Sequence, residues 1–204
     1  MAPEGSDSGA GTIDSPRGNE HLIIDGNTVI NACTGDEEIV GGTQQHISVS
    51  HSSNFEITNH TVYRGGKEGI DFKNGAHDGI ISGNTVYDLS RLGIYIDGYR
   101  EHTYTIEVFG NEVYRCKGGI RANSEEGGLV ENVAIYGNSI YDNGQDGIRV
   151  SVPANGSIAD IHLFNNTISR SGRSGSIDSL YINRLFSIGL WEYRAAGTTA
   201  RAPN

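Results

Sequence analysis

Ionisable and polar side chains recur at one place in a repeated pattern, just after a Gly-Ile pair. Four copies of the pair recur at intervals of 24, 26 and 28 residues: Gly69-Ile70, Gly93-Ile94, Gly119-Ile120 and Gly147-Ile148. The residues one and three places after each Ile are, in order, Asp71 and Lys73, Tyr95 and Asp97, Arg121 and Asn123, Arg149 and Ser151. Carboxylates, an ammonium, a phenol and guanidinium groups are the side chains that acid–base catalysis and anion binding use.

β-Elimination on a uronic-acid polymer is the first chemistry that this set could perform. It needs a base that removes the proton α to the carboxylate and a cation that neutralises that carboxylate. In this scheme Lys73 is the base and Tyr95 protonates the leaving oxygen. Arg121 and Arg149, which repel each other unless an anion lies nearby, neutralise the substrate.

Glycoside hydrolysis is the alternative chemistry, with Asp71 and Asp97 as the catalytic carboxyl groups. One repeat and two strand positions separate them, which predicts a backbone separation of about 8 Å. Inverting glycosidases hold their two carboxyl groups about 6.5–9.5 Å apart. The sequence therefore permits an inverting hydrolase as well as a lyase.

Other polar residues extend the expected substrate surface. Asn123 lies on the same strands as the catalytic candidates, and the loops that follow those strands add His51, His77, Tyr99, Arg100, His102 and Glu125. Tyr95 and Tyr99 could stack on pyranose rings, while Asn and Arg side chains could hold hydroxyl and carboxylate groups. We expect Asn123, Tyr99, Arg100 and His77, with the two arginines, to bind substrate.

A non-catalytic interpretation also accounts for these columns. Like charges on adjacent strands repel, so stacked columns need charge balance. Lys73 beside Asp97, with Glu68 and Arg91 nearby, could serve only this balance. The surface would then bind a glycan, or the protein would be a structural or adhesive module. A Lys73 tightly paired with Asp97 would argue against its role as a base.

The elements that position these residues follow from a second repeat. Asn27, His60, Asn84, Asn111, Asn138 and Asn166 follow one another at 33, 24, 27, 27 and 28 residues. An aliphatic residue lies three places before each one, and Val or Ile lies two places after it. A period of 20–50 residues indicates stacked supersecondary units.

Each repeat unit is built from strands. Apolar residues alternate with polar ones over short runs, as in Val133/Ile135 and Ile161/Leu163, and no sustained helical stripe occurs. Three short strands in about 27 residues describe one coil of a parallel β-solenoid, with successive coils about 4.8 Å apart. The sequence therefore predicts about six coils, an internal ladder of Asn amides in which His60 substitutes once, and a Tyr column.

The chain resembles the right-handed parallel β-helix proteins of the pectate-lyase-like superfold. The resemblance lies in Gly83-Asn84-Thr85-Val86-Tyr87-Asp88, Gly110-Asn111-Glu112-Val113-Tyr114, Gly137-Asn138-Ser139-Ile140-Tyr141-Asp142 and Asn165-Asn166-Thr167-Ile168. It implies an all-β fold and a carbohydrate-active protein. In relatives that eliminate uronates the base is Lys or Arg and calcium often assists, which makes calcium a possible cofactor. This chain lacks the dense Asp cluster of the calcium-dependent lyases.

The domain boundaries are predicted from composition. Residues 1–20 are rich in Gly, Ser, Asp and Pro and are expected to form a disordered lead; residues 21–182 form the β-helix. Residues 183–204 are expected to form a C-terminal cap and tail, because the apolar stretch 185–191 interrupts the repeat. Open solenoid ends expose unpaired strands, so a homo-oligomer through the ends is a further expectation.

Charge and hydropathy limit the partners. The formal net charge of −10 argues against non-specific nucleic-acid binding, which depends on Lys and Arg. No apolar run reaches the 18 residues of a membrane span, and no signal peptide is visible. The family resemblance nevertheless implies an extracellular or cell-surface location. We expect an enzyme acting on a polysaccharide, with the lyase first, the hydrolase as alternative, no metal ligands and a non-catalytic glycan-binding protein as the third possibility.

Overall fold

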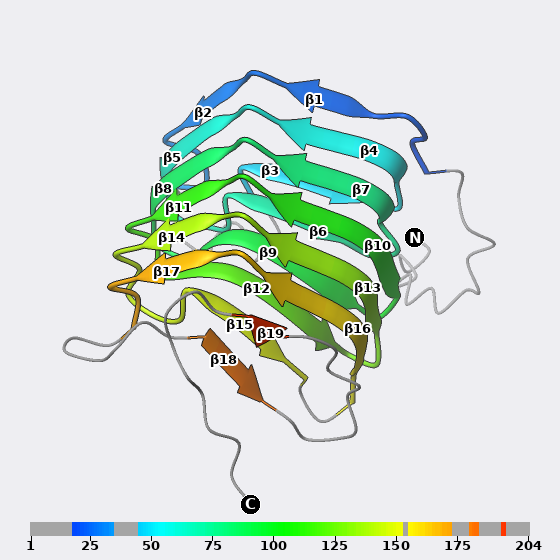
Figure 1. Cartoon of the computed structure of the whole chain (residues 1–204). Helices are drawn as coiled ribbons and strands as arrows, with labels where there is room; N and C mark the ends of the chain where they lie inside the picture. The colour runs from blue at the N-terminus through cyan, green and yellow to red at the C-terminus, as the bar shows by residue number, and fades with distance from the viewer. Residues whose placement is uncertain (1–17, 35–44, 153–154, 173–179, 184–192, 195–204) are drawn as a thin grey trace, which may run out of the picture.

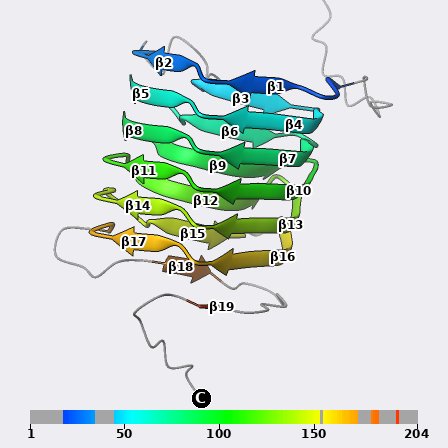
Figure 2. The same ribbon diagram turned by 45° about the horizontal axis from the view of Figure 1, so that its top comes forward.

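The computed structural model describes residues 18–34, 45–152, 155–172, 180–183 and 193–194, the last two segments by their backbone only. Three parallel sheets wind along one axis, and each coil contributes one strand to each sheet (Figure 1). Seen from a second direction, the strands lie in nearly level tiers, one coil above the next (Figure 2). The predicted all-β parallel solenoid is confirmed.

We name the three sheets A, B and C. Sheet A has seven strands: β1 (Ile23–Asp25), β4 (Ser53–Thr58), β7 (His77–Ser82), β10 (His102–Phe109), β13 (Leu129–Tyr136), β16 (Ser157–Phe164) and β19 (Tyr193–Arg194). Sheet B has six: β2 (Thr28–Ile30), β5 (Thr61–Gly65), β8 (Thr85–Leu89), β11 (Glu112–Tyr114), β14 (Ser139–Tyr141) and β17 (Thr167–Ser169). Sheet C also has six: β3 (Ile47–Ser50), β6 (Ile70–Lys73), β9 (Leu92–Tyr99), β12 (Gly118–Glu125), β15 (Ile148–Ser151) and β18 (Leu180–Asn183).

Stacked aliphatic columns fill the interior between the sheets. In sheet A, Ile57 pairs with Ile81, Ile81 with Val108 and Val108 with Ile135, and all four side chains are fully buried. Equivalent columns come from sheet B, starting at Val62, and from sheet C, starting at Ile70. Alternate side chains of each strand point outward, so the inner columns fix which residues the outer faces present.

The predicted amide ladder is present and runs through the turn between sheets A and B. Asn84 donates its backbone N–H and its side-chain Nδ2 to Oδ1 of Asn111, at 3.0 and 2.9 Å. Asn111 does the same to Asn138, and Asn138 to Asn166. His60 continues the ladder with an imidazole: Nδ1 accepts from the Asn27 N–H at 2.9 Å, and Nε2 lies 2.9 Å from the Ile24 carbonyl.

The Tyr column also stacks as predicted. The rings of Tyr63, Tyr87, Tyr114 and Tyr141 lie nearly parallel, with successive centroids 4.8–4.9 Å apart. This spacing follows the coil repeat, so the aromatic stack reports the same register as the sheets.

The ends of the chain are described only in part. Glu20, within the predicted disordered lead, forms an isolated parallel bridge with Ser53. Residues 1–17 of that lead, and residues 184–192 and 195–204 of the predicted C-terminal cap and tail, lie outside the described residues.

Candidate functional site

The outer face of sheet C carries the columns that the sequence predicted. Asp71 of β6 pairs with Tyr95 of β9, Tyr95 with Arg121 of β12, and Arg121 with Arg149 of β15. Asp97 pairs with Asn123, and Asn123 with Ser151, in the second column. Parallel pairing therefore brings residues from four coils onto one surface.

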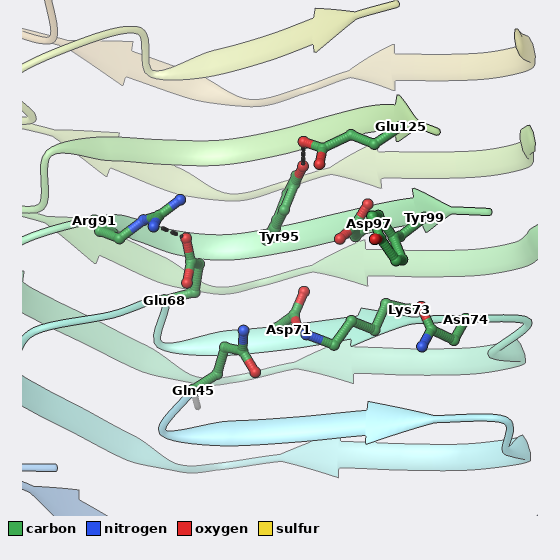
Figure 3. A pocket seen from close by; sticks show the side chains of 10 residues that line it. All are labelled: Gln45, Glu68, Asp71, Lys73, Asn74, Arg91, Tyr95, Asp97, Tyr99 and Glu125. Atoms are coloured by element: carbon green, nitrogen blue, oxygen red, sulfur yellow. Dashed lines mark hydrogen bonds and ion pairs between the residues drawn. The ribbon is translucent and has the colours of Figure 1, made fainter. Parts of the chain in front are cut away.

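A cavity of about 380 Å³ opens on this face, and we call it the acidic pocket (Figure 3). It is lined by Gln45, Glu68, Asp71, Lys73, Asn74, Arg91, Tyr95, Asp97, Tyr99 and Glu125. All four predicted catalytic residues, Lys73, Tyr95, Asp71 and Asp97, are among the lining residues, and so is Tyr99.

Two ion pairs organise the acidic pocket. The Lys73 ammonium lies 2.9 Å from Oδ2 of Asp71, and Nε of Arg91 lies 2.7 Å from Oε1 of Glu68. The predicted pairing of Lys73 with Asp97 on the next coil is therefore wrong. Lys73 and Asp71 are two places apart on one strand, so their side chains share a face. A buried charged group is costly without a partner, and Asp71 is more deeply buried than Asp97.

The two aspartates have unusual electrostatics. Asp71 is completely buried, and this burial raises its pKa to about 6 although Lys73 opposes the shift. Burial, together with the negative charges of Asp71 and Glu125, raises the pKa of Asp97 to about 8. Oδ1 of Asp97 is buried and accepts no hydrogen bond from any described residue. At neutral pH one carboxyl group is thus mostly ionised and the other mostly protonated.

A hydrogen-bond network holds the third acid, Glu125, beside them. The Tyr95 hydroxyl donates to Oε1 of Glu125 at 2.6 Å, and Nδ2 of Asn123 donates to the same oxygen at 2.7 Å. Oδ1 of Asn123 accepts from the Ser151 hydroxyl at 2.8 Å. Burial raises the pKa of Tyr95, so this phenol stays protonated and acts as a hydrogen-bond donor. Asn123, predicted to bind substrate, lies in this buried network and not among the residues that line the pocket.

A second cavity of about 260 Å³ lies next to the first, and we call it the basic pocket. Its lining residues are Arg91, Leu92, Lys117, Arg121, Gln145 and Arg149, so Arg91 is common to both cavities. Nη2 of Arg121 is 3.5 Å from Oε1 of Gln145, and Nη1 of Arg149 is 3.7 Å from Oδ2 of Asp146. Burial and the neighbouring Arg149 lower the pKa of Arg121.

Two predicted substrate-binding residues lie elsewhere. His77 is the first residue of β7 in sheet A, where its ring stacks on Tyr104 at 4.5 Å and lines a different cavity with His51 and Glu101. The sequence placed His77 in a loop beside the sheet C columns. The turn after β6 is short, so His77 instead starts β7 and belongs to sheet A. Arg100 lies between β9 and β10, with its guanidinium 4.8 Å from the Tyr99 ring and 3.7 Å from Glu126. It therefore lies outside the acidic pocket that Tyr99 lines.

Several residues that line the two pockets were not predicted from the sequence. Gln45 and Asn74 lie just outside strands β3 and β6, where no column assignment reaches them. Lys117 and Gln145 occupy the turns that precede the Gly-Ile pairs, and only the recurrence of polar residues there could have indicated a role. The sequence suggests that Glu68 and Arg91 balance charge between neighbouring coils, and in the structure they form an ion pair.

Two carboxyl groups of the acidic pocket already have cationic partners. Asp71 and Glu68 are each paired with a cationic side chain. Within the described ranges, no group of three or more His, Cys, Asp or Glu side chains is arranged to hold a metal ion. The described residues also contain no helix long and apolar enough to cross a membrane.

Comparison with protein families agrees with the architecture. A family profile described as the right-handed β-helix region matches residues 17–183. The chain belongs to this family. No curated protein matches the chain at a significant level. Membership in the right-handed β-helix family establishes the hand of the solenoid and supports, at family level, a carbohydrate-active or β-solenoid protein.

Proposed function

We propose that this β-helix protein is a glycoside hydrolase that uses Asp97 as general acid and Asp71 as general base. The observation that carries the proposal is the pair of buried carboxyls on adjacent coils, with pKa values raised to about 6 for Asp71 and about 8 for Asp97. Environments that push two carboxyl pKa values apart provide an acid and a base at one pH. A rigid parallel sheet holds both groups in place.

The reaction follows from these protonation states. Asp97 donates its proton to the glycosidic oxygen as the bond from that oxygen to the anomeric carbon breaks. A water molecule attacks the anomeric carbon from the opposite face and loses a proton to Asp71. Exchange with solvent then returns a proton to Asp97 and removes one from Asp71. The register that pairs Asp71 with Tyr95 puts the backbones of the two aspartates about 8 Å apart, a spacing from which their side chains can hold the carboxyl groups at the separation that inversion needs.

A polysaccharide lyase is the second candidate, since the basic pocket offers arginines that could neutralise a uronate. Its base would have to be Lys73, and an eliminating base must be uncharged. The Lys73 ammonium is engaged in an ion pair, 2.9 Å from Oδ2 of Asp71, and would have to leave this partner to reach a substrate proton. The geometry therefore supports hydrolysis better than elimination.

Cleavage assays on a panel of neutral and acidic polysaccharides test the proposal. We expect new reducing ends without unsaturated uronate, inversion at the anomeric carbon by NMR, and activity highest between about pH 6 and 8. Activity should fall below this window as Asp71 is protonated and above it as Asp97 ionises. Asp71→Asn and Asp97→Asn should each lose roughly 100-fold or more in rate.

Asp160→Asn, an exposed change on β16, is the matched control and should keep full activity. Unsaturated products that disappear with Lys73→Ala would instead establish the lyase. Binding of a polymer with no cleavage under any condition would support the non-catalytic glycan-binding protein and contradict both enzymatic proposals.

A further inference from the structure

Charge is segregated along the outer face of sheet C. Four carboxyl groups line the acidic pocket, those of Glu68, Asp71, Asp97 and Glu125, against the two cations Lys73 and Arg91. Both of these cations are within 3 Å of a carboxylate oxygen. The basic pocket is lined by Arg91, Lys117, Arg121 and Arg149 and by no acid.

The two pockets follow one another along the solenoid axis. The acidic pocket takes its residues from β6, β9 and their flanking turns, together with Gln45 before β3 and Glu125 at the end of β12. The basic pocket takes its residues from the start of β9, from β12 and β15, and from the turns before these three strands. Because adjacent coils are about 4.8 Å apart, an extended polymer lying along the axis would occupy both pockets at once.

The acidic pocket is suited to a neutral sugar residue. An anionic sugar residue placed there would lie beside the carboxylates of Glu68, Asp71 and Glu125, which costs electrostatic free energy in a partly dehydrated site. Sugar hydroxyl groups, by contrast, can donate hydrogen bonds to acceptors that have none. Oε1 of Gln45, Oδ1 of Asn74 and Oδ1 of Asp97 are buried oxygens of this kind.

The basic pocket is suited to an anionic substituent. Arg121 and Arg149 occupy directly paired positions on β12 and β15, so their guanidinium groups repel each other, and Asp146, 3.7 Å from Arg149, offsets only one of the two charges. Nε of Arg121 is buried and has no hydrogen-bond partner among the described residues. An oxyanion would supply that partner and would form the short, charge-assisted hydrogen bonds that guanidinium groups make with carboxylate or sulfate.

We propose that the substrate is a mixed polysaccharide in which a neutral residue occupies the acidic pocket and a neighbouring residue places a carboxylate or sulfate ester in the basic pocket. This inference rests on the proposed hydrolase and names its substrate class. A polymer with a charge on every residue fits less well, since one charged residue would have to enter the acidic pocket. The anionic group that the basic pocket binds is then on a different sugar residue from the one held in the acidic pocket, where the glycosidic bond is cleaved.

Binding measurements with the full chain test this division. The probes are glucuronoxylan, its carboxyl-reduced form, partially sulfated xylan, unmodified xylan and polygalacturonate, each titrated into the Asp97→Asn protein so that none is consumed. We expect glucuronoxylan or sulfated xylan to bind at least tenfold more tightly than the uncharged xylans and more tightly than polygalacturonate. The two charged xylans distinguish a carboxylate from a sulfate as the preferred anion.

Variants then locate the anion. Arg121→Gln combined with Arg149→Gln should weaken binding of the preferred charged xylan by roughly tenfold or more for each arginine and leave unmodified xylan unchanged. Arg115→Gln removes one exposed guanidinium group that lines neither pocket, and should have no effect. Added salt should weaken binding of the wild-type protein to the charged xylan, which tests the charge contact without any substitution.

Three results would overturn the inference: equal binding of charged and carboxyl-reduced polymers, unchanged binding by the double arginine variant, or tightest binding to polygalacturonate. The proposed hydrolase fails separately. Absence of reducing ends from any polymer would refute hydrolysis while the binding pattern stood, whereas cleavage of xylan without preference for a charged xylan would refute only the basic pocket.

Discussion

At the scale of single residues, burial on an outward-facing strand gives Asp71 and Asp97 their chemistry. An outward column would normally be solvated, but the neighbouring side chains of sheet C cover these carboxyls, leaving Asp71 0% and Asp97 7% exposed. Desolvation disfavours the charged form, and the three nearby acids disfavour it further. The same covering distinguishes this surface from a solvated charge ladder, which was the non-catalytic interpretation of the sequence.

Asp97 should make the stability of the protein depend on pH. Its pKa is about 8 in the folded protein and 3.8 as a reference value, so the folded state holds the proton more tightly. Its stabilising contribution is complete below about pH 4 and is lost as the pH rises towards 8. The free energy of unfolding of Asp97→Asn, relative to that of the wild type, should therefore rise by on the order of a few kcal/mol between pH 4 and 9.

Denaturant unfolding at several pH values measures this difference. Asp160→Asn, with its side chain exposed on β16, serves as the control for loss of one carboxyl group. A free-energy difference between Asp97→Asn and the wild type that stays constant from pH 4 to 9 would show that Asp97 is not perturbed.

At the scale of elements, the amide ladder holds the coils in register. Each ladder Asn side chain accepts from the preceding coil through Oδ1 and donates through Nδ2 to a carbonyl of that coil, as Asn111 does to Ile81 at 2.9 Å. The imidazole of His60 reproduces both functions, with Nδ1 as acceptor and Nε2 facing the Ile24 carbonyl. This pattern assigns the hydrogen of the ring to Nε2.

Substitutions in the ladder should separate buried from exposed positions. Asn111→Ala leaves the N–H of Asn84 and the carbonyl of Ile81 without partners inside the solenoid, and should cost roughly 2–4 kcal/mol of unfolding free energy. Asn27→Ala, at the exposed end of the same column, should cost much less. His60→Asn should be tolerated far better than His60→Ala, because an amide can make both bonds. Equal losses for Asn111→Ala and Asn27→Ala in thermal or denaturant unfolding would count against the ladder.

The sequence predicts these elements well because stacking imposes identity on them. A residue that lies above its equivalent in each coil meets the same neighbours, so the Asn, Tyr and aliphatic columns recur in the chain. Side-chain pairing within the outer face recurs less. Lys73 could reach Asp97 or Asp71, and only the complete burial of Asp71 in the folded protein decides between them. Turn length similarly decides that His77 belongs to sheet A.

At the scale of the whole molecule, the solenoid brings separated residues into one electrostatic site. Four coils from β4 to β15 are described without interruption, and sheet C continues beyond them at both ends. Asp71, Asp97 and Glu125 are 26 and 28 residues apart in the sequence, yet Asp71 and Glu125 both raise the pKa of Asp97. The predominant charge of the lining side chains changes from negative in the acidic pocket to positive in the basic pocket. A bound polymer would therefore meet a different charge at each end of the site.

Titration of the aspartate carboxyl carbons by NMR, in the wild type and in Glu125→Gln, tests most directly whether stacked coils create an acid–base pair. We predict midpoints of about 8 for Asp97 and about 6 for Asp71, assigned with the two Asp→Asn variants. The midpoint of Asp97 should fall in Glu125→Gln, because a charge on the next coil is removed. Midpoints near 4 for both carboxyls, insensitive to Glu125→Gln, would contradict the account.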